Sequence, residues 1–168
     1  MHGFRKCMQM RNNDFSYEVR WARPEEWKES MDMVWDTFIK FEGEDYTNEG
    51  IRNFYDFIYD KGLYRSFMNG DYLAMVAKDG DKVIGFASIR DGDLLSLLFV
   101  EESYHRQGVG RTLVERLCTY LKRDMGQTRM RVKASPYGLN FYERCGFVAV
   151  MPEQRYAGIR VTPMERYL

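Results

Sequence analysis

Two Asp-Gly dipeptides, Asp79-Gly80 and Asp91-Gly92, constrain the fold of this chain more than any other feature of its sequence. They separate three runs that are rich in β-branched and other apolar residues, 72–78, 82–90 and 94–100. Asp-Gly between such runs is a strong hairpin signal, because glycine adopts the positive φ that a tight turn requires. The segment therefore predicts an antiparallel meander of three strands.

Helical periodicity precedes the meander. Apolar residues recur at helical spacing over 24–43, with acidic residues in the first turn, where they complement the helix dipole. A second stripe extends over 47–61, with Thr47 as its cap and Gly62 just past its end. We expect two helices here, packed against the sheet through their apolar faces.

The pattern after the meander alternates between helix and strand. A stripe of Val and Leu predicts a helix over 108–126, and a shorter helix is expected over 136–146. The remaining strand-like segments are 16–21, 128–133, 147–151 and 159–167, the last of which is weakened by Pro163. The order β-α-α-β-β-β-α-β-α-β-β indicates one mixed α/β domain over 16–168, preceded by an N-terminal tail or edge segment at 1–15.

The composition excludes several classes of protein. An apolar fraction of 45% and an aromatic fraction of 15% are too high for a disordered chain, and 168 residues suit one domain. The 25 basic and 25 acidic residues balance, which argues against nonspecific nucleic-acid binding. Three cysteines without a CxxC motif indicate a reducing, cytoplasmic compartment, and two distant histidines offer no metal site. The longest wholly apolar run, 72–77, is far too short to cross a membrane.

A glycine-rich loop is the strongest functional signal from the residues alone. A predicted strand ends, a short polar loop follows, and Gly108 and Gly110 open a helix beside Arg106 and Arg111. Unpaired N–H groups of a first helical turn bind anions, so this loop could hold a phosphate or pyrophosphate. The alternative is an ordinary strand-to-helix turn that uses glycine for its geometry. Neither a GxxxxGK[ST] motif nor the third glycine of a dinucleotide fingerprint is present.

Three segments together resemble the GCN5-related N-acetyltransferase (GNAT) family. His105-Arg-Gln-Gly-Val-Gly110 is similar to the family signature [RQ]xxGx[GA], whose amides hold the pyrophosphate of acetyl-CoA. Leu98-Phe-Val100 resembles the end of its fourth strand, and Asn140-Phe-Tyr-Glu-Arg-Cys-Gly-Phe147 resembles its FYxxxGF segment. The resemblance implies a single α/β (α+β) domain whose mixed, mostly antiparallel sheet is flanked by about four helices, with the fourth and fifth strands splayed apart.

The resemblance also implies an activity, direct transfer of the acetyl group of acetyl-CoA to a primary amine on a small molecule or peptide. By resemblance to that family, the Val100 N–H of this chain would polarise the thioester carbonyl. Tyr142 would protonate the departing thiolate. A phenol suits this role because it stays protonated at neutral pH. The cofactor-binding residues implied are Phe99, Val100, His105, Gln107, Gly108, Val109, Gly110, Arg111, Ser135 and Tyr142. Two of them depart from the family pattern: His105 replaces Arg or Gln, and Ser135 replaces a common Asn. Cys145, in the same motif as Tyr142, is expected to be a buried small residue rather than a nucleophile.

No general base is evident in the sequence. The glutamate that some family members carry on the fourth strand corresponds here to Leu94. The remaining candidates, also the candidates for acceptor binding, are Glu42, Glu44 and Asp45 in the loop between the first two helices. A solvated acidic connector is an equally good interpretation of that loop, and a water chain could replace the base.

Two other functions compete with the transferase hypothesis. One is a catalytically weak CoA-binding sensor or interaction module of the same fold, and the other is an unrelated domain that uses the loop for another anion. No metal, nucleic-acid or membrane partner is expected, and an apolar interface leaves room for a homodimer. The net charge is −6 over 20–60 and +6 over 104–147, which suggests a cationic acceptor and an anionic cofactor on different parts of the protein.

Overall fold

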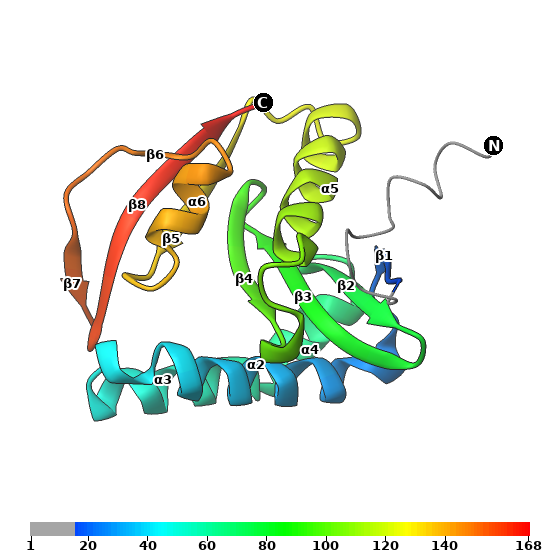
Figure 1. Ribbon diagram of the computed structural model, residues 1–168, viewed down its shortest axis with the longest axis horizontal. Coiled ribbons are helices and arrows are strands. Elements are labelled where there is room, and N and C mark those ends of the chain that lie inside the picture. The colour runs from blue at the N-terminus through cyan, green and yellow to red at the C-terminus, as the bar shows by residue number, and fades with distance from the viewer. Residues whose placement is uncertain (1–15) are drawn as a thin grey trace.

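Residues 16–168 are described by a computed structural model (Figure 1), and the tail or edge segment expected at 1–15 lies outside the described residues. Within the described range, one open eight-stranded sheet has the order β1-β2-β3-β4-β5-β8-β6, with β7 paired to β8. Neighbouring strands are antiparallel except for β4 and β5. The strands are β1 (Glu18–Trp21), β2 (Leu73–Asp79), β3 (Lys82–Arg90), β4 (Leu94–Val100), β5 (Arg129–Ala134), β6 (Val148–Ala149), β7 (Gln154–Tyr156) and β8 (Ile159–Tyr167). The helices are α2 (Trp27–Phe41), α3 (Asn48–Ile58), α4 (Lys61–Met68), α5 (Val109–Arg123) and α6 (Leu139–Arg144), with short 3₁₀ turns η1 (Pro24–Glu26), η2 (Gly43–Asp45) and η3 (Glu102–Tyr104). The mixed, mostly antiparallel α/β class is thus confirmed.

The meander predicted from the Asp-Gly dipeptides is formed by β2, β3 and β4. Gly80 and Gly92 have φ values of 57° and 83°, in the left-handed region that glycine adopts without steric cost. β3 pairs with β2 on one side and with β4 on the other. The turn chemistry therefore placed three central strands correctly.

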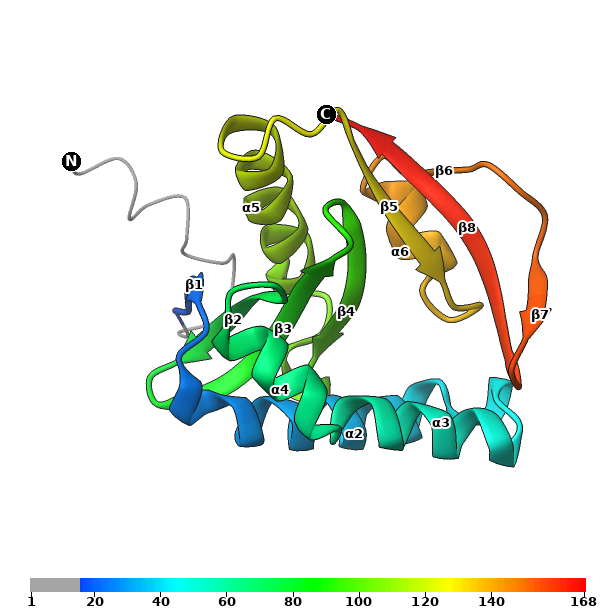
Figure 2. The same cartoon turned by 180° about the vertical axis from the view of Figure 1, so that it is seen from behind.

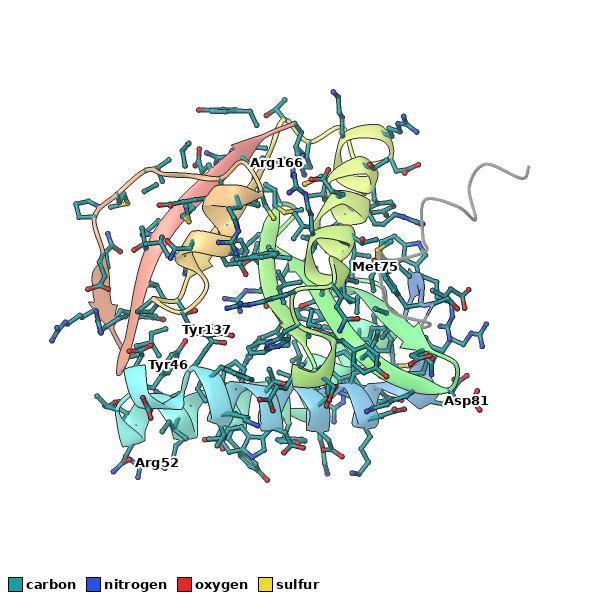
Figure 3. All side chains as sticks on the ribbon, in the orientation of Figure 1. Tyr46, Arg52, Met75, Asp81, Tyr137 and Arg166 are labelled. Carbon is teal, nitrogen blue, oxygen red and sulfur yellow. The ribbon has the colours of Figure 1, made fainter. Side chains whose placement is uncertain are left out.

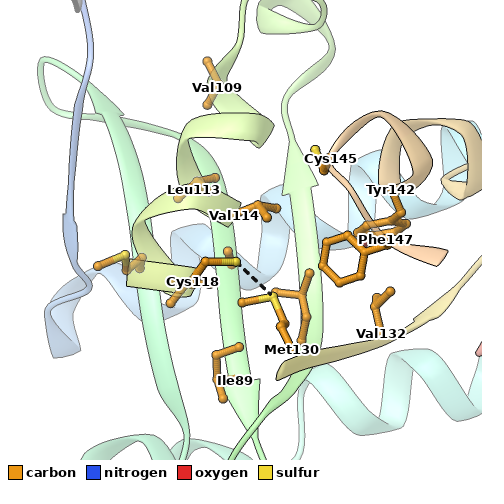
Figure 4. Packing of buried hydrophobic residues seen from close by; sticks show 14 of the residues in the cluster. Ile89, Val109, Leu113, Val114, Cys118, Met130, Val132, Tyr142, Cys145 and Phe147 are labelled. Carbon is orange, nitrogen blue, oxygen red and sulfur yellow. Dashed lines mark hydrogen bonds between the residues drawn. The ribbon is translucent and has the colours of Figure 1, made fainter. Parts of the chain in front are cut away.

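Helices pack against the sheet in two separate hydrophobic cores. One core combines Trp27, Met31 and Phe38 of α2 with sheet residues such as Phe86, and Figures 1 and 2 show α2, α3 and α4 side by side there. The other core lies under α5 and α6, as Figure 4 shows in close-up. Leu113 of α5 is completely buried in it, and burial of such a side chain contributes roughly 2 kcal/mol.

Three details differ from the sequence prediction. The chain forms an additional helix, α4, because the Asp60 side chain accepts a hydrogen bond from the Gly62 amide at 2.8 Å and caps it. The described residues therefore contain five α-helices rather than about four. The strand expected over 147–151 is reduced to two residues, and β7 is an additional short strand.

Pro163 does not shorten β8. It lies opposite Lys133 of β5, and its carbonyl accepts a hydrogen bond from the Val150 amide at 3.0 Å. A residue's N and O point to the same edge of a strand, so the missing N–H of Pro163 faces the outer side. The partner strand on that side, β6, ends at Ala149, so the missing N–H of Pro163 removes no hydrogen bond between two strands.

A β-bulge at Ser96 separates β4 from β5. Leu95 pairs with Ile89 of β3 and Leu97 with Ser88, so Ser96 is the extra residue. The hydroxyl of Ser88 accepts a hydrogen bond from the Leu97 amide at 3.2 Å. β4 pairs with β5 only through Leu94 and Leu95, immediately before the bulge. Because a bulge bends its strand, β4 turns away from β5 beyond this point. The predicted splay of the fourth and fifth strands is confirmed.

The β7–β8 turn contacts the start of α3, which packs on the other half of the sheet, and we call this contact the Thr47–Gly158 junction. The Thr47 amide donates to the Gly158 carbonyl at 3.0 Å. A Cβ on Gly158 would lie 2.2 Å from Thr47 Oγ1, and one on Gly50 would lie 2.4 Å from the Gly158 oxygen. Only glycine at both positions permits this approach. Figure 1 shows the β7–β8 turn resting on the start of α3.

Candidate active site

A cavity of about 490 Å³ fills the space between the splayed strands β4 and β5. Its walls also come from the end of α2, from Glu42 and Tyr46 on either side of η2, from α3, from the β4–α5 loop, and from the segment around α6. In Figure 3, Tyr46 and Tyr137 lie across the opening between α2–α3 and α6. Most of the residues singled out from the sequence are therefore brought to one place.

The end of β4 directs backbone groups into this cavity. The Glu101 amide donates to the Ile84 carbonyl of β3 at 2.8 Å. Because successive amides along a strand point to opposite edges, the Val100 N–H points away from β3, toward the gap. By the same alternation, the N–H and C=O of Leu98 also point toward the gap. Phe99 lies opposite Phe86, and its N–H and C=O point toward β3.

Phe99 lines the cavity as expected, but its amide and carbonyl face β3, so Val100 rather than Phe99 directs its backbone N–H into the gap. The backbone of Leu98, two residues before Val100 on the same strand, also faces the gap. The Phe99 side chain instead lies on the α2–α3 side, 5.9 Å from the Phe54 ring centroid.

His105 fixes the loop that follows β4. Its Nε2 lies 2.6 Å from the Val100 carbonyl oxygen, and because a carbonyl can only accept, Nε2 carries the proton. The ring also packs 4.9 Å from that of Phe41. The Val100 carbonyl is thus occupied by His105, and its N–H is the group left facing the gap.

The glycine-rich loop ends as the sequence predicts, at the N-terminus of α5. Gly108 is the N-cap and has a φ of 82°, and no acidic residue lies in the first turn of the helix. Arg106 has a φ of 60°, a left-handed conformation that costs a non-glycine residue about 1–2 kcal/mol. Such strain is found where a loop must aim its amides.

Three arginines surround this helix end. Arg106, Arg111 and Arg144 line a second hollow, of about 470 Å³, that shares five lining residues with the main cavity. Open amides, a positive helix end and guanidinium groups together suit the pyrophosphate of CoA. Gln107 lines neither hollow, and its Nε2 donates to the Ser103 carbonyl at 3.1 Å, which leaves its backbone amide for this role. Val109 is completely buried, so its side chain packs in the core.

Tyr142 lines the cavity and is 9% exposed. Its ring packs edge-on against Phe147 at 5.5 Å, a contact visible in Figure 4. A Cβ on Gly138 would approach the Tyr142 ring to 3.1 Å, so this glycine gives the ring its room. Burial, and then the charge of Glu42, raise the pKa of Tyr142. The phenol therefore stays protonated and can donate a proton.

Glu42 is the acidic side chain that the structure places inside the cavity. Burial raises its pKa from 4.5 to about 6, a hydrogen bond with Ser135 lowers it, and the charge of Asp45 raises it. A carboxylate with a pKa near neutrality can hold or release a proton under physiological conditions. Glu44 is exposed and Asp45 pairs with Arg160 at 3.7 Å, and neither lines the cavity.

Ser135 lines the main cavity and is partly buried, and Cys145 lines the second hollow and is buried. The Ser135 hydroxyl accepts a hydrogen bond from the Gly138 amide at 3.1 Å, so it orders the turn under Tyr142. Cys145 is buried, and desolvation raises the pKa of its thiol. A neutral buried thiol is a poor nucleophile.

Sequence reasoning missed several cavity residues, because no motif contains them. They are Thr37, Tyr46, Ser96, Lys133 and Tyr137, whereas Phe41 and Phe54 belong to the aromatic stripes of the first two predicted helices. Only the end of the helical stripe over 24–43 and the acidic loop after it gave a signal. Among residues 16–168, no cluster of His, Cys, Asp and Glu could hold a metal ion, and no helix is long and apolar enough to cross a membrane.

Comparison with known proteins gives a consistent family. The family model described as Acetyltransferase (GNAT) domain matches residues 42–168. A GCN5-related N-acetyltransferase from Rhodopseudomonas palustris superposes with a TM-score of 0.80 at 21% identity, covering 94% of this chain and 100% of that one. No protein of curated function matches in sequence.

Two further solved structures contain coenzyme A. The PaiA N-acetyltransferase from Thermoplasma acidophilum has a TM-score of 0.74 at 21% identity, over 91% of this chain and 99% of that one. An aminoglycoside 6'-N-acetyltransferase has a TM-score of 0.61 at 16% identity, over 89% and 96%. At these identities the likeness shows a common fold.

Proposed function

Because the chain belongs to the GNAT acetyltransferase family, we propose that it transfers the acetyl group of acetyl-CoA directly to a primary amine. The observation that carries the proposal is the arrangement in one cavity of the Val100 N–H, the Tyr142 hydroxyl and the Glu42 carboxylate. Each suits a different need of acyl transfer: an oxyanion donor, an acid and a base.

Acetyl-CoA supplies an activated thioester, and the loop residues would hold its phosphates. The amides that follow Gly108, with Arg106, Arg111 and Arg144, would bind the pyrophosphate at the start of α5. The gap-facing backbone of Leu98 and Val100 would bind the pantetheine arm. Similar structures that contain coenzyme A support this assignment.

The reacting atoms would then lie between Val100 and Tyr142. The Val100 N–H donates to the thioester oxygen, where negative charge grows as the amine nitrogen attacks the carbonyl carbon. Glu42 accepts a proton from the ammonium group and so frees the nitrogen lone pair; the second proton passes to solvent as the amide forms, and the proton on Glu42 returns through solvent to Tyr142 after the transfer. As the C–S bond breaks, Tyr142 gives its proton to the leaving sulfur, so a free thiol and an N-acetyl product result.

A competing function is a CoA-binding sensor of the same fold, which the lack of a carboxylate on β4 favours. A buried Glu42 in the cavity answers that objection, since it offers a carboxylate from another element. The experiment that separates the two functions measures binding and thiol release together. Calorimetry should detect acetyl-CoA binding, and a panel of primary amines should cause thiol release. Tight binding without release on any amine would favour the sensor.

A further inference from the structure

The acceptor side of the cavity lies beside a contact between the two halves of the molecule. The Thr47–Gly158 junction joins the start of α3 to the β7–β8 turn, and Asp45 pairs with Arg160 of β8 at 3.7 Å beside it. Figure 2 shows from behind that β8 and α3 meet there. Residues 42–47 therefore bridge the two halves of the molecule next to Glu42.

The charge inside the cavity suits a single ammonium group. Of the described residues that line it, Glu42 alone carries a carboxylate. Lys133 of β5 lines it as well, and its ammonium group lies over the Tyr156 ring, 6.0 Å from the centroid. A second ammonium group would find no acidic partner among the residues that line the cavity.

The wall beside Glu42 is aromatic and continuous. Phe54 stacks on Phe38 with ring centroids 4.0 Å apart, and Tyr46 meets Phe38 edge-on at 4.8 Å. Phe41 lies 5.4 Å from Tyr137 across the opening. Aromatic faces attract both apolar groups and a desolvated ammonium ion. The wall therefore favours an acceptor whose body is apolar.

We propose that the acceptor is a small primary monoamine with an aromatic or bulky apolar body. Its one ammonium group pairs with Glu42, and its body packs on the wall formed by Phe41, Tyr46 and Phe54. The inference rests on the proposed acetyl transfer and names the class of amine that this cavity accepts. It predicts against polyamines, whose second ammonium group has no carboxylate partner in the cavity, and against lysine side chains of proteins, which offer no aromatic body to the wall.

Three probes compare these classes directly: phenylethylamine, putrescine, and a short blocked peptide with one lysine. Thiol release from acetyl-CoA is measured for each with the full-length protein. We expect kcat/KM for phenylethylamine to exceed that for the other two by at least about tenfold. Acetylation of putrescine or of the peptide at an equal or higher kcat/KM would overturn the inference while leaving acetyl transfer intact. Thiol release with none of the amines would overturn acetyl transfer itself, and the inference with it.

A charge reversal sharpens the test through a gain of function. Lys133→Glu adds a second carboxylate to the cavity and should raise the ratio of kcat/KM for putrescine to that for phenylethylamine by about tenfold. Lys122→Glu, on the exposed side of α5, makes the same charge change away from the cavity and should leave the ratio unchanged. An equal ratio in both variants would show that Lys133 does not face the acceptor and would overturn the charge argument.

Discussion

Replacement of Glu42 by Gln should make the protein more stable and less active at the same time. Burial raises the pKa of Glu42 to about 6 from an ordinary 4.5, so the folded state disfavours the charged form. The folded state therefore holds the proton more tightly than the unfolded chain, and stability is lost as pH rises from about 4.5 through about 6. At 1.36 kcal/mol for each unit of pKa, the penalty above pH 6 amounts to about 2 kcal/mol.

Glu42→Gln removes this penalty, because the amide has nearly the same shape and no charge. Urea unfolding at pH 7.5 should show a gain of up to about 2 kcal/mol, reduced by any weakening of the hydrogen bond with Ser135. At pH 4, where the wild-type carboxyl is protonated, the two proteins should be nearly equal in stability. Glu44→Gln, two residues away on the exposed side of η2, is the matched control and should change neither value.

Activity should move in the opposite direction. In the wild type, turnover should rise with pH through about 6 as Glu42 loses its proton and can act as the base. Glu42→Gln should lose that rise and fall in kcat by about 10²-fold or more. A variant that keeps the wild-type rate and pH profile would refute the base assignment, and one that gains no stability at pH 7.5 would refute the desolvation on which it rests.

Three other predictions address the acid, the loop and the fold. Tyr142→Phe should lower kcat by about 10²-fold while calorimetry shows unchanged acetyl-CoA binding; an unchanged kcat would exclude the acid role. Gly110→Val should weaken acetyl-CoA binding, since even a Cβ would lie 3.3 Å from the Phe141 ring; unaltered affinity would contradict the close approach. Glu26, hydrogen-bonded to Arg20 at 2.8 Å, has its pKa lowered to about 2, chiefly by that bond. The contribution of Glu26 to stability is present above about pH 4.5 and is lost as pH falls toward 2. Glu26→Gln should therefore lower the free energy of unfolding at pH 7 by about 2–3 kcal/mol and make that free energy depend less on pH between 4.5 and 2. A variant as stable as the wild type would contradict this.

The parts of the fold that local chemistry controls were predictable. Asp-Gly turns placed the meander, and the Gly108 cap placed the start of α5, because each depends on a residue's own backbone preference. The splay of β4 from β5 depends on the Ser96 bulge, which no local pattern marks. It is held by Ser88 and by Tyr72, whose hydroxyl donates to the Ser96 hydroxyl at 2.9 Å.

The candidate site was predictable in its cofactor half and only partly in its acceptor half. The phosphate loop is one continuous segment, so its residues could be named together. From the sequence, Glu42 was only one of three candidates, with Glu44 and Asp45. Glu42 differs from the other two because it lies in the cavity with Ser135 and Tyr137, which are about 90 positions away along the chain. Which of Leu98 and Phe99 faces the gap depends on pairing with β3, which is a tertiary property.

Transfer of a labelled acetyl group tests the proposed activity most directly. The protein is incubated with acetyl-CoA carrying carbon-13 in its acetyl group and with phenylethylamine, and thiol release and the mass of the amine are followed together. We predict that N-acetylated amine carrying the label forms in equal amount with free CoA thiol, and that Tyr142→Phe slows both equally. Binding of acetyl-CoA without labelled product on this or any other primary amine would contradict the proposal.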